Sequence, residues 1–348
     1  MNSVLIGSRA ISPQEKCYII AEIGVNHNGD VKLAHRLIDV AKTAGADAVK
    51  FQTYCTDSLV RSSASKATYQ LEQTGEGSQH EMLRKFELTR QEFTDLRLHC
   101  EEVGIDFMST AFDESSLEFV ASLHPSCIKW PSGEIDNINF LRKACNLDLP
   151  VVLSTGMSSI ADISRAVDCM IRENQQNFVI LQCTSLYPAP LEVQNLKCIP
   201  ALQQAFNCPV GFSDHTAGLQ AAIAARALGM CVLEKHITLD RAMDGPDHQA
   251  SIDSGDFKTL VDNVRSIELA LGTGFKAPHP LELNVKAVAR RSLVYTSDFE
   301  SGHVLTEIDV SSKRPADGLP PTMYDQVLGS TILRPVLANT CIQFADLG

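Results

Sequence analysis

The chain has 348 residues, of which 44% are hydrophobic and 21% charged, a composition that suits a large core or two domains. The formal net charge of −12 argues against nucleic acid or an anionic membrane as a partner, although local lysines still allow an anionic small substrate. No apolar run approaches a membrane span, residues 1–13 lack the regions of a signal peptide, and the 11 cysteines lack C-x-x-C spacing, which predicts reduced thiols in the cytoplasm.

Eight apolar runs of strand length recur along the chain, and each is followed by a segment with helical spacing. The runs span residues 17–24, 47–53, 106–112, 126–132, 151–156, 178–184, 209–215 and 230–236. The helical segments span residues 33–44, 91–103, 115–123, 138–145, 160–172, 196–206, 216–229 and 257–271. Thr89 and Glu92 form a capping box at the start of one helix, and glycines such as Gly45 and Gly272 end others.

The number and spacing of these units predict the fold class. Eight strand–helix units within about 270 residues are typical of a TIM (β/α)8 barrel. An open, doubly wound α/β sheet is the alternative, but no unit carries a glycine-rich dinucleotide-binding motif, so we prefer the barrel. We expect the barrel domain to span residues 1–280.

Two stretches depart from this repeat. Residues 54–90 form a polar insertion after the second strand. Loops of this length often act as lids or contact loops, but a surface loop without a function fits the sequence equally well. Residues 273–280 contain glycine, proline and lysine, as a linker does. Beyond them, short β-type runs at 292–296, 310–312 and 332–336 predict a small, mostly β domain over residues 281–348.

Polar side chains gather where the predicted strands end. Parallel strands covered on both sides are usually apolar throughout, and TIM barrels place their active sites at the carboxyl ends of the strands. The polar residues at these ends are Glu22, Asn26, Lys50, Gln52, Ser109, Thr110, Lys129, Ser132, Glu134, Ser154, Thr155, Thr184, Ser185, Tyr187 and Ser213. The neutral hydrogen-bonding groups among them, together with Asp247, suit a sugar-type substrate.

Lys50 and Lys129 lie inside apolar runs, where a buried charge is costly unless an anion pairs with it. With the nearby hydroxyl groups they describe a pocket for a phosphate or a carboxylate. The alternative is that each lysine forms an internal salt bridge with a carboxylate such as Glu22 or Glu134. Strand alternation predicts that Lys235 instead points to the outer face of its strand and packs against the helices.

His215 and His236 end the last two apolar runs. The carboxyl ends of neighbouring parallel strands lie together, and two imidazoles there predict a site for a divalent metal. For either residue alone, the alternative is an ordinary hydrogen-bonded histidine that binds no metal. The polar segment 244–248 that follows favours a functional site.

Several segments together resemble the sialic acid synthase family, also called N-acetylneuraminate synthase or NeuB-like. They are Ala21-Glu22-Ile23-Gly24-x-Asn26-His27-x-Gly29, Ala44-Gly45-Ala46-Asp47, Lys50-Phe51-Gln52, Ser154-Thr155-Gly156-Met157, Gln182-Cys183-Thr184-x-x-Tyr187-Pro188, Gly211-x-Ser213-Asp214-His215, Glu234-x-His236 and Gly245-Pro246-Asp247-His248. In the predicted small domain, Lys313-Arg314-Pro315-x-x-Gly318 resembles the antifreeze-like (SAF) module of these enzymes. The resemblance covers essentially the whole chain.

The resemblance implies a TIM barrel with a SAF domain, a domain-swapped homodimer and a divalent metal, manganese or magnesium. It also implies a reaction in which phosphoenolpyruvate, an open-chain N-acetylated mannosamine-type sugar and water give a nine-carbon 2-keto sugar acid and phosphate, with C–O cleavage. The implied metal ligands are His215 and His236. The implied catalytic residues are Glu134, Lys50, Lys129 and Glu22. The implied substrate-binding residues are Gln52, Thr110, Ser132, Ser154, Ser185, Tyr187, Ser213, Asp247 and Arg314.

Two details distinguish this chain within the resemblance. Bacterial sialic acid synthases have Cys-Thr-Asn before the tyrosine, whereas this chain has Cys183-Thr184-Ser185, a departure that bears on a side-chain contact to phosphoenolpyruvate. Residues 131–135 and the insertion motif Tyr69-Gln70-x-x-x-Thr74-Gly75 resemble the synthases of legionaminic acid, a 6-deoxy relative of sialic acid. N-acetylneuraminate and N,N'-diacetyllegionaminate are therefore both candidate products.

Two other functions remain open from the sequence. A lysine-dependent aldolase would use Lys50 or Lys129 as a Schiff base on pyruvate, but the two histidines favour a metal-assisted reaction. A non-catalytic sugar-binding protein would leave the polar strand ends unexplained. The expected partners are small molecules and a second copy of the chain, and we expect neither nucleic acid nor a membrane.

Overall fold

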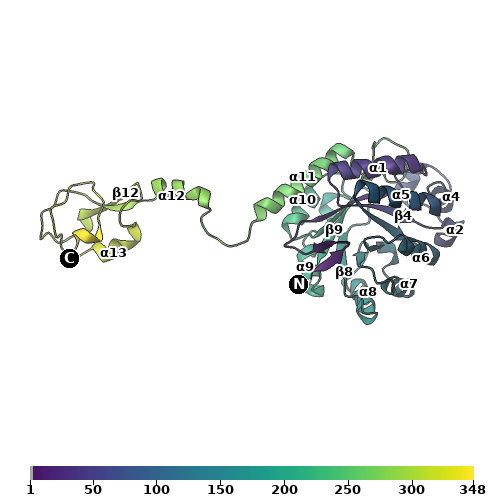
Figure 1. The fold of residues 1–348 in the computed structure, drawn as a ribbon, viewed down its shortest axis with the longest axis horizontal. Coiled ribbons are helices and arrows are strands. Elements are labelled where there is room, and N and C mark those ends of the chain that lie inside the picture. Colours follow the sequence, from purple (N-terminus) through teal and green to yellow (C-terminus); the bar gives the residue numbers. More distant parts are fainter. Residues whose placement is uncertain (1–2) are drawn as a thin grey trace. The chain divides into compact units, whose positions relative to one another are not determined.

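The computed structural model describes residues 3–348, which divide into two compact units after Gly272. The first unit holds the barrel, and the second, Thr273–Gly348, holds the linker and the small domain (Figure 1). The division precedes the expected boundary between residues 280 and 281, because the chain leaves the barrel at Gly272, directly after its last helix.

Eight parallel strands close into a barrel with helices around it (Figure 1), which confirms the predicted TIM fold. In the order of their neighbours the strands are β10 (Val232–His236), β3 (Tyr18–Gly24), β4 (Ala48–Thr53), β5 (Asp106–Ala111), β6 (Ile128–Trp130), β7 (Val151–Ser154), β8 (Phe178–Cys183) and β9 (Val210–Asp214). The surrounding helices are α1 (Val31–Ala44), α5 (Arg90–Val103), α6 (Glu114–Ser122), α7 (Ile138–Cys145), α8 (Ile160–Arg172), α9 (Cys198–Phe206), α10 (Gln220–Ala227) and α11 (Ser254–Leu271). Each element overlaps the range predicted from the sequence.

The side chains of each strand alternate between two cores. Those that point outward, such as Ile19 and Phe212, pack in the larger core beneath the helices. Those that point inward, such as Ile20 and Val232, fill the lower part of the barrel. Further along the same inward rows the side chains become polar, as from Ile20 to Glu22. The apolar interior therefore ends where a polar pocket begins.

A β-hairpin that the sequence did not predict precedes the barrel. Strands β1 (Val4–Ile6) and β2 (Arg9–Ile11) pair antiparallel. Val4, Ile6 and Ile11 share one apolar cluster with inward side chains at the amino ends of the strands, among them Tyr18 and Cys231. The hairpin therefore covers the end of the barrel opposite the polar strand ends.

The insertion after β4 folds into short helices instead of an irregular loop. They are α2 (Thr56–Leu59), α3 (Thr68–Thr74) and α4 (Gln79–Arg84), and a capping box between Ser78 and Glu81 starts α4. The Tyr54 hydroxyl donates to the Leu83 carbonyl oxygen at 3.1 Å, which ties α4 to the end of β4. The insertion is therefore held to the barrel at its carboxyl end.

The second unit contains the predicted small, β-rich domain. It comprises α12 (Leu283–Ala289), which buries no residue, and the antiparallel strands β11 (Ser292–Tyr295) and β12 (Val310–Lys313) with α13 (Tyr324–Val327), which contribute to an apolar core of their own. The predicted strand at 332–336 is wrong, because Ile332 and Val336 form only isolated bridges, to Leu347 and Phe299. None of the helices within residues 3–348 combines the length and hydropathy that a membrane crossing needs.

Candidate active site

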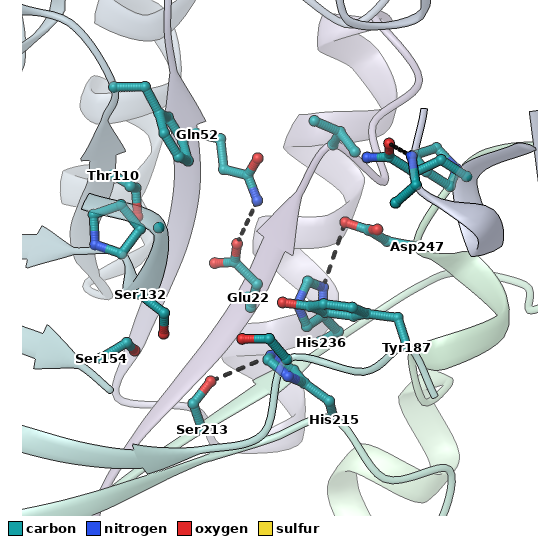
Figure 2. Close-up of a pocket in the computed structure, with 18 of the residues that line it drawn as sticks. Glu22, Gln52, Thr110, Ser132, Ser154, Tyr187, Ser213, His215, His236 and Asp247 are labelled. Atoms are coloured by element: carbon teal, nitrogen blue, oxygen red, sulfur yellow. Dashed lines mark hydrogen bonds and ion pairs between the residues drawn. The ribbon is translucent and has the colours of Figure 1, made fainter. Parts of the chain in front are cut away.

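A pocket of about 520 Å³ lies at the carboxyl ends of the barrel strands (Figure 2). All eight barrel strands line it, through Glu22, Lys50, Gln52, Thr110, Lys129, Ser154, Cys183, Ser213, Glu234 and His236. The loops that follow the strands add Ser132, Glu134, Ser185, Tyr187, His215 and Asp247. Every catalytic, substrate-binding or metal-binding residue that the family resemblance implied therefore lines this one pocket, except Arg314, which belongs to the second unit.

Two buried lysines on the pocket floor share two carboxylates. Lys50 Nζ lies 2.8 Å from Glu22 Oε2 and 3.7 Å from Glu234 Oε2. Lys129 Nζ lies 3.6 Å from the same Glu234 oxygen. Both proposals for the lysines therefore apply, since each forms an internal ion pair and each also faces the pocket. The alternative partner Glu134 forms no ion pair with either lysine.

Hydroxyl groups complete the surroundings of these lysines. Lys50 Nζ donates to Thr110 Oγ1 at 3.1 Å, and Lys129 Nζ donates to Ser154 Oγ at 2.8 Å. Ser132 Oγ accepts from the backbone N–H of Gly156 at 2.8 Å. Two ammonium groups ringed by hydroxyls form a suitable site for the phosphate and carboxylate of a small dianion.

Gly156 shows how closely the loops approach one another beside this floor. A Cβ atom at position 156 would overlap Ser185 Oγ and lie 3.0 Å from Ser132 Oγ, so a larger residue there would force the Ser185 hydroxyl to move. Ser185, which stands where the resemblance implies an asparagine, presents a hydroxyl to the pocket. The departure from the family motif therefore preserves a polar group at this position but shortens its reach.

Glu234 is the site residue that the sequence reasoning missed. It is buried, and it accepts from Ser213 Oγ at 2.8 Å in addition to its contacts with the two lysines. Although burial opposes its ionisation, Lys129 and Lys50 lower the pKa of Glu234 to about 2. The motif Glu234-x-His236 could have predicted that Glu234 lines the pocket, because strand alternation places its side chain on the same face of β10 as His236.

His215 and His236 lie side by side, with ring centroids 5.5 Å apart, and Tyr187 packs against both rings (Figure 2). His215 Nδ1–H donates to the Thr184 carbonyl oxygen at 2.7 Å, and Nε2 lies 3.3 Å from Ser213 Oγ. His236 Nδ1 is buried without a hydrogen-bond partner. Burial, and then the charge of His215, hold the pKa of His236 well below its usual value, so it is neutral.

This arrangement fits a divalent metal held by two imidazoles. The hydrogen bond from His215 Nδ1–H to the Thr184 carbonyl oxygen is of the kind that orients a metal-binding imidazole. No third His, Cys, Asp or Glu within residues 3–348 joins the pair in a ready-made metal cluster. The protein would therefore supply two nitrogen ligands and leave coordination positions for water or substrate, as catalytic metal sites do.

Asp247 and Glu22 are the two pocket carboxyls with pKa values near neutrality. Asp247 Oδ2 lies 3.9 Å from His236 Nδ1, and burial raises the pKa of Asp247 to about 6. Burial also raises the pKa of Glu22 to about 7, against the attraction of Lys50, and Gln52 Nε2 donates to Glu22 Oε1 at 3.1 Å. Groups with such pKa values can exchange protons with a substrate at physiological pH.

Asp247→Asn is expected to raise the free energy of unfolding of the metal-stripped protein at pH 8 by roughly 3 kcal/mol. The pKa of the wild-type carboxyl is about 6 in the folded state and 3.8 in the unfolded chain, so its contribution to stability falls as the pH rises between these values. Below about pH 4 the carboxyl is protonated in both states, and the difference between the proteins should vanish. Urea unfolding at both pH values measures the effect, and an equal pH dependence for the two proteins would contradict the assignment.

Asn26 and Glu134, two further polar residues near the strand ends, bond to neighbouring loop segments. Asn26 donates to the Ile237 carbonyl oxygen and to Ser251 Oγ, so its side chain joins two loops. Glu134 lines the pocket but accepts from Asn137 Nδ2 at 2.8 Å, and no contact joins it to either histidine. Its expected place beside a metal stays a prediction.

The insertion forms one wall of the pocket, as the contact-loop interpretation predicted. Its lining residues are Leu59, Val60, Ala67, Tyr69, Gln70, Gln79, Met82 and Leu83. Tyr69 stacks on Tyr187 with ring centroids 5.1 Å apart, and Tyr187 in turn packs against His215. The insertion is thus connected to the two histidines through a pair of aromatic rings.

Comparison with known proteins decides the family. The NeuB family model matches residues 37–276, and the SAF domain model matches residues 290–348. The chain belongs to the NeuB family. Within this family it is 41% identical to an N,N'-diacetyllegionaminic acid synthase of Legionella pneumophila, over 94% of this chain and 93% of that protein. It is also 41% identical to an N,N'-diacetyllegionaminic acid synthase of Campylobacter jejuni, over 90% of this chain and 95% of that protein.

A solved structure of a NeuB relative agrees with this fold. The N-acetylneuraminic acid synthetase of Leptospira borgpetersenii, in complex with citrate, superimposes with a TM-score of 0.73 and 31% identity. The match covers 82% of this chain and 95% of that chain. The NeuB membership therefore rests on the sequence and on the barrel together.

Proposed function

We propose that this NeuB-family protein is a nonulosonate synthase that condenses phosphoenolpyruvate with an open-chain N-acetylated amino sugar and water. The observation that carries the proposal is the common pocket, in which the Lys50 and Lys129 ammonium groups lie together with the His215 and His236 imidazoles. The names of the two synthase relatives and the family match support the same reaction class. The product would be a nine-carbon 2-keto sugar acid, released with phosphate.

The lysine end of the pocket is the proposed site for phosphoenolpyruvate. Lys50 and Lys129 would neutralise its carboxylate and phosphate, and the nearby hydroxyls would hold the phosphate oxygens. The proposed hydroxyl contacts are Thr110, Ser132, Ser154, Ser185 and Ser213. Glu234 keeps the two ammonium groups in place before the substrate arrives, because it pairs with both.

The histidine end is the proposed site for the reacting aldehyde of the sugar. A divalent cation such as Mn²⁺ or Mg²⁺, held by His215 and His236, would supply Lewis acidity toward the aldehyde oxygen. Asp247, 3.9 Å from His236, and Gln52, which lines the same pocket, would orient the sugar hydroxyls. Tyr187 packs against both imidazoles and would exclude water from them.

The bond changes require proton transfers that the pocket carboxyls can perform. C3 of phosphoenolpyruvate bonds to the aldehyde carbon, water adds at C2, and the C2–O bond to phosphate breaks. Asp247 or Glu22, with pKa values of about 6 and 7, would deliver a proton to the new hydroxyl group. Glu134, at the pocket wall, would take a proton from the attacking water.

The acceptor that we propose is a 2,4-diacetamido-2,4,6-trideoxymannose, which leads to N,N'-diacetyllegionaminate. The identity of 41% to two synthases of that name supports this choice. The insertion also presents apolar side chains to the pocket, among them Leu59, Val60 and Leu83, which suit a methyl group better than a hydroxyl. N-acetylmannosamine, which leads to N-acetylneuraminate, is the competing acceptor.

The acceptor is tested by kcat/KM for both sugars at saturating phosphoenolpyruvate, measured as phosphate release. We expect a preference of roughly 10- to 100-fold for the diacetamido 6-deoxy sugar, because an apolar pocket rejects an added hydroxyl only modestly. Measurable turnover of N-acetylmannosamine is consistent with this. A higher kcat/KM for N-acetylmannosamine would assign the protein to N-acetylneuraminate synthesis instead.

Two chains are proposed to complete each other's sites as a domain-swapped homodimer. Arg314, directly after β12, is exposed and has no hydrogen-bond or ion-pair partner among the described residues. Phe275 and Leu281 in the linker are 83% and 84% exposed, although large apolar side chains are usually covered. A second copy of the chain would cover these side chains and receive Arg314, whose guanidinium suits an N-acetyl carbonyl or a carboxylate.

One observation favours a Schiff-base aldolase as the second candidate. Burial, opposed by Glu234, lowers the pKa of Lys129, and a lysine with a lowered pKa can act as a nucleophile. Borohydride reduction in the presence of pyruvate separates the two reactions. The synthase forms no covalent adduct under these conditions, whereas trapping of pyruvate on Lys129 would establish the aldolase.

A further inference from the structure

Lys235 is a fully buried charge that the proposed chemistry does not use. It lies between Glu234 and His236 on β10, but it does not line the pocket, and its exposed fraction is 0%. This agrees with the predicted outward orientation. Burying an ammonium group is costly unless anions and carbonyl oxygens surround it. The partners of Lys235 therefore indicate what this charge does in the fold.

The polar contacts of Lys235 within residues 3–348 all go to the chain around His215. Nζ lies 3.0 Å from Asp214 Oδ2, and Asp214 is also 0% exposed. Nζ donates to the carbonyl oxygens of Thr216, at 2.5 Å, and Gly218, at 3.1 Å. Asp214 Oδ1 accepts from the Thr216 N–H at 2.8 Å. One ammonium group thus holds the residues on both sides of His215.

The register of the two strands places this pair behind the histidines. Lys235 lies directly beside Asp214 in the pairing of β10 with β9. Because side chains alternate along a strand, this pair lies on the outer side of the barrel wall. His215 and His236, each one residue further along, turn into the pocket. Lys235 therefore joins the strand that carries one histidine to the segment that carries the other.

We infer that Lys235 is a positioning residue that sets the spacing and orientation of His215 and His236, and thereby the affinity of the pocket for a divalent cation. The inference rests on the proposed metal site, and it gives Lys235 no contact with metal or substrate. Two ligands bind a cation tightly when neighbouring groups fix them before it arrives. Without this ammonium group, the Thr216 carbonyl loses the lysine donor, and the Gly218 carbonyl keeps only the Thr216 hydroxyl, at 3.3 Å.

The test variant combines Asp214→Asn with Lys235→Met. Lys235→Met alone would leave a buried carboxylate without a partner, which destabilises the whole protein and confuses the readout. The double change removes both charges, and the amide at position 214 can still accept from the Thr216 N–H. If this variant does not fold, Asp214→Asn with Lys235→Gln keeps a polar pair in the buried site with a shorter reach, and the same result is expected.

The matched control combines Arg226→Met with Glu268→Gln. Arg226 is also buried, its Nε lies 3.3 Å from Glu268, and it donates to the Met230 carbonyl oxygen at 2.6 Å. It lies at the amino end of β10, away from the histidines. The control therefore removes a buried ion pair and a backbone tie from the same part of the barrel.

Mn²⁺ dissociation constants are measured by calorimetry on the metal-stripped full chain, together with thermal unfolding. We expect roughly 10- to 100-fold weaker Mn²⁺ binding in the Asp214/Lys235 variant, with kcat at saturating Mn²⁺ within a few-fold of wild type. The control should lose thermal stability but keep the wild-type dissociation constant. An unchanged dissociation constant in the Asp214/Lys235 variant, or equal weakening in both variants, would overturn the inference. A wild-type protein that does not bind Mn²⁺ would overturn the proposed metal site itself, and the inference with it.

Discussion

His215→Ala is expected to lower kcat/KM by roughly a thousandfold or more, because a Lewis acid at a developing charge contributes several kcal/mol. The same loss is expected for wild-type protein after chelation, and Mn²⁺ should restore the wild type fully. Added Mn²⁺ should not restore His215→Ala, since one of only two imidazoles in the pocket is gone. Initial rates of phosphate release with and without a chelator measure both effects.

His248→Ala serves as the control for this experiment. His248 is also buried near the pocket, but it bonds to Thr238 and Asn28 and does not line the pocket. Its removal should leave the response to Mn²⁺ unchanged. Wild-type protein that keeps full activity after verified removal of metal would contradict the role assigned to His215 and His236.

Arg314→Ala and His236→Ala should each be inactive, and mixing them should recover activity once their subunits exchange. In a domain-swapped dimer, the heterodimer contains one site that has both an intact His236 and an intact Arg314. Random exchange would make roughly a quarter of all sites whole, by the two-fold symmetry of the pair. Activity after mixing, relative to wild type at the same chain concentration, measures this fraction.

The control for the exchange experiment is Lys313→Ala, which neighbours Arg314 and contacts Asn339 within the small domain. It should remain active alone. Exchange itself is followed with two differently tagged chains. Demonstrated exchange without any recovery of activity would mean that Arg314 serves its own barrel or no site.

The barrel could be predicted because its signals are local and repeated. Each of the eight strands is a short apolar run with a helix pattern after it, and the closure of the barrel then follows from their number. The pocket could be predicted because inward rows change from apolar to polar at one end, as from Ile20 to Glu22 and from Val232 to Glu234. Parallel strands bring all such changes to one face.

The features that were missed depend on contacts between distant parts of the chain. Glu234 acquires its role only because Lys50 and Lys129, far away in the sequence, come within 3.7 Å of it. The hairpin β1–β2 consists of two strands of three residues each, and packing against the barrel interior stabilises it more than any local pattern. The helices of the insertion are likewise short and are held by the barrel end.

The reaction itself is tested most directly with phosphoenolpyruvate that carries oxygen-18 in the bridge between C2 and phosphorus. Incubation with the diacetamido 6-deoxy sugar and Mn²⁺ should release phosphate only when the sugar is present. The label should appear in the phosphate, because the C–O bond breaks, and the organic product should be a nine-carbon 2-keto acid. Phosphate release that does not depend on the sugar, or label retained in the keto acid, would contradict the proposed synthase.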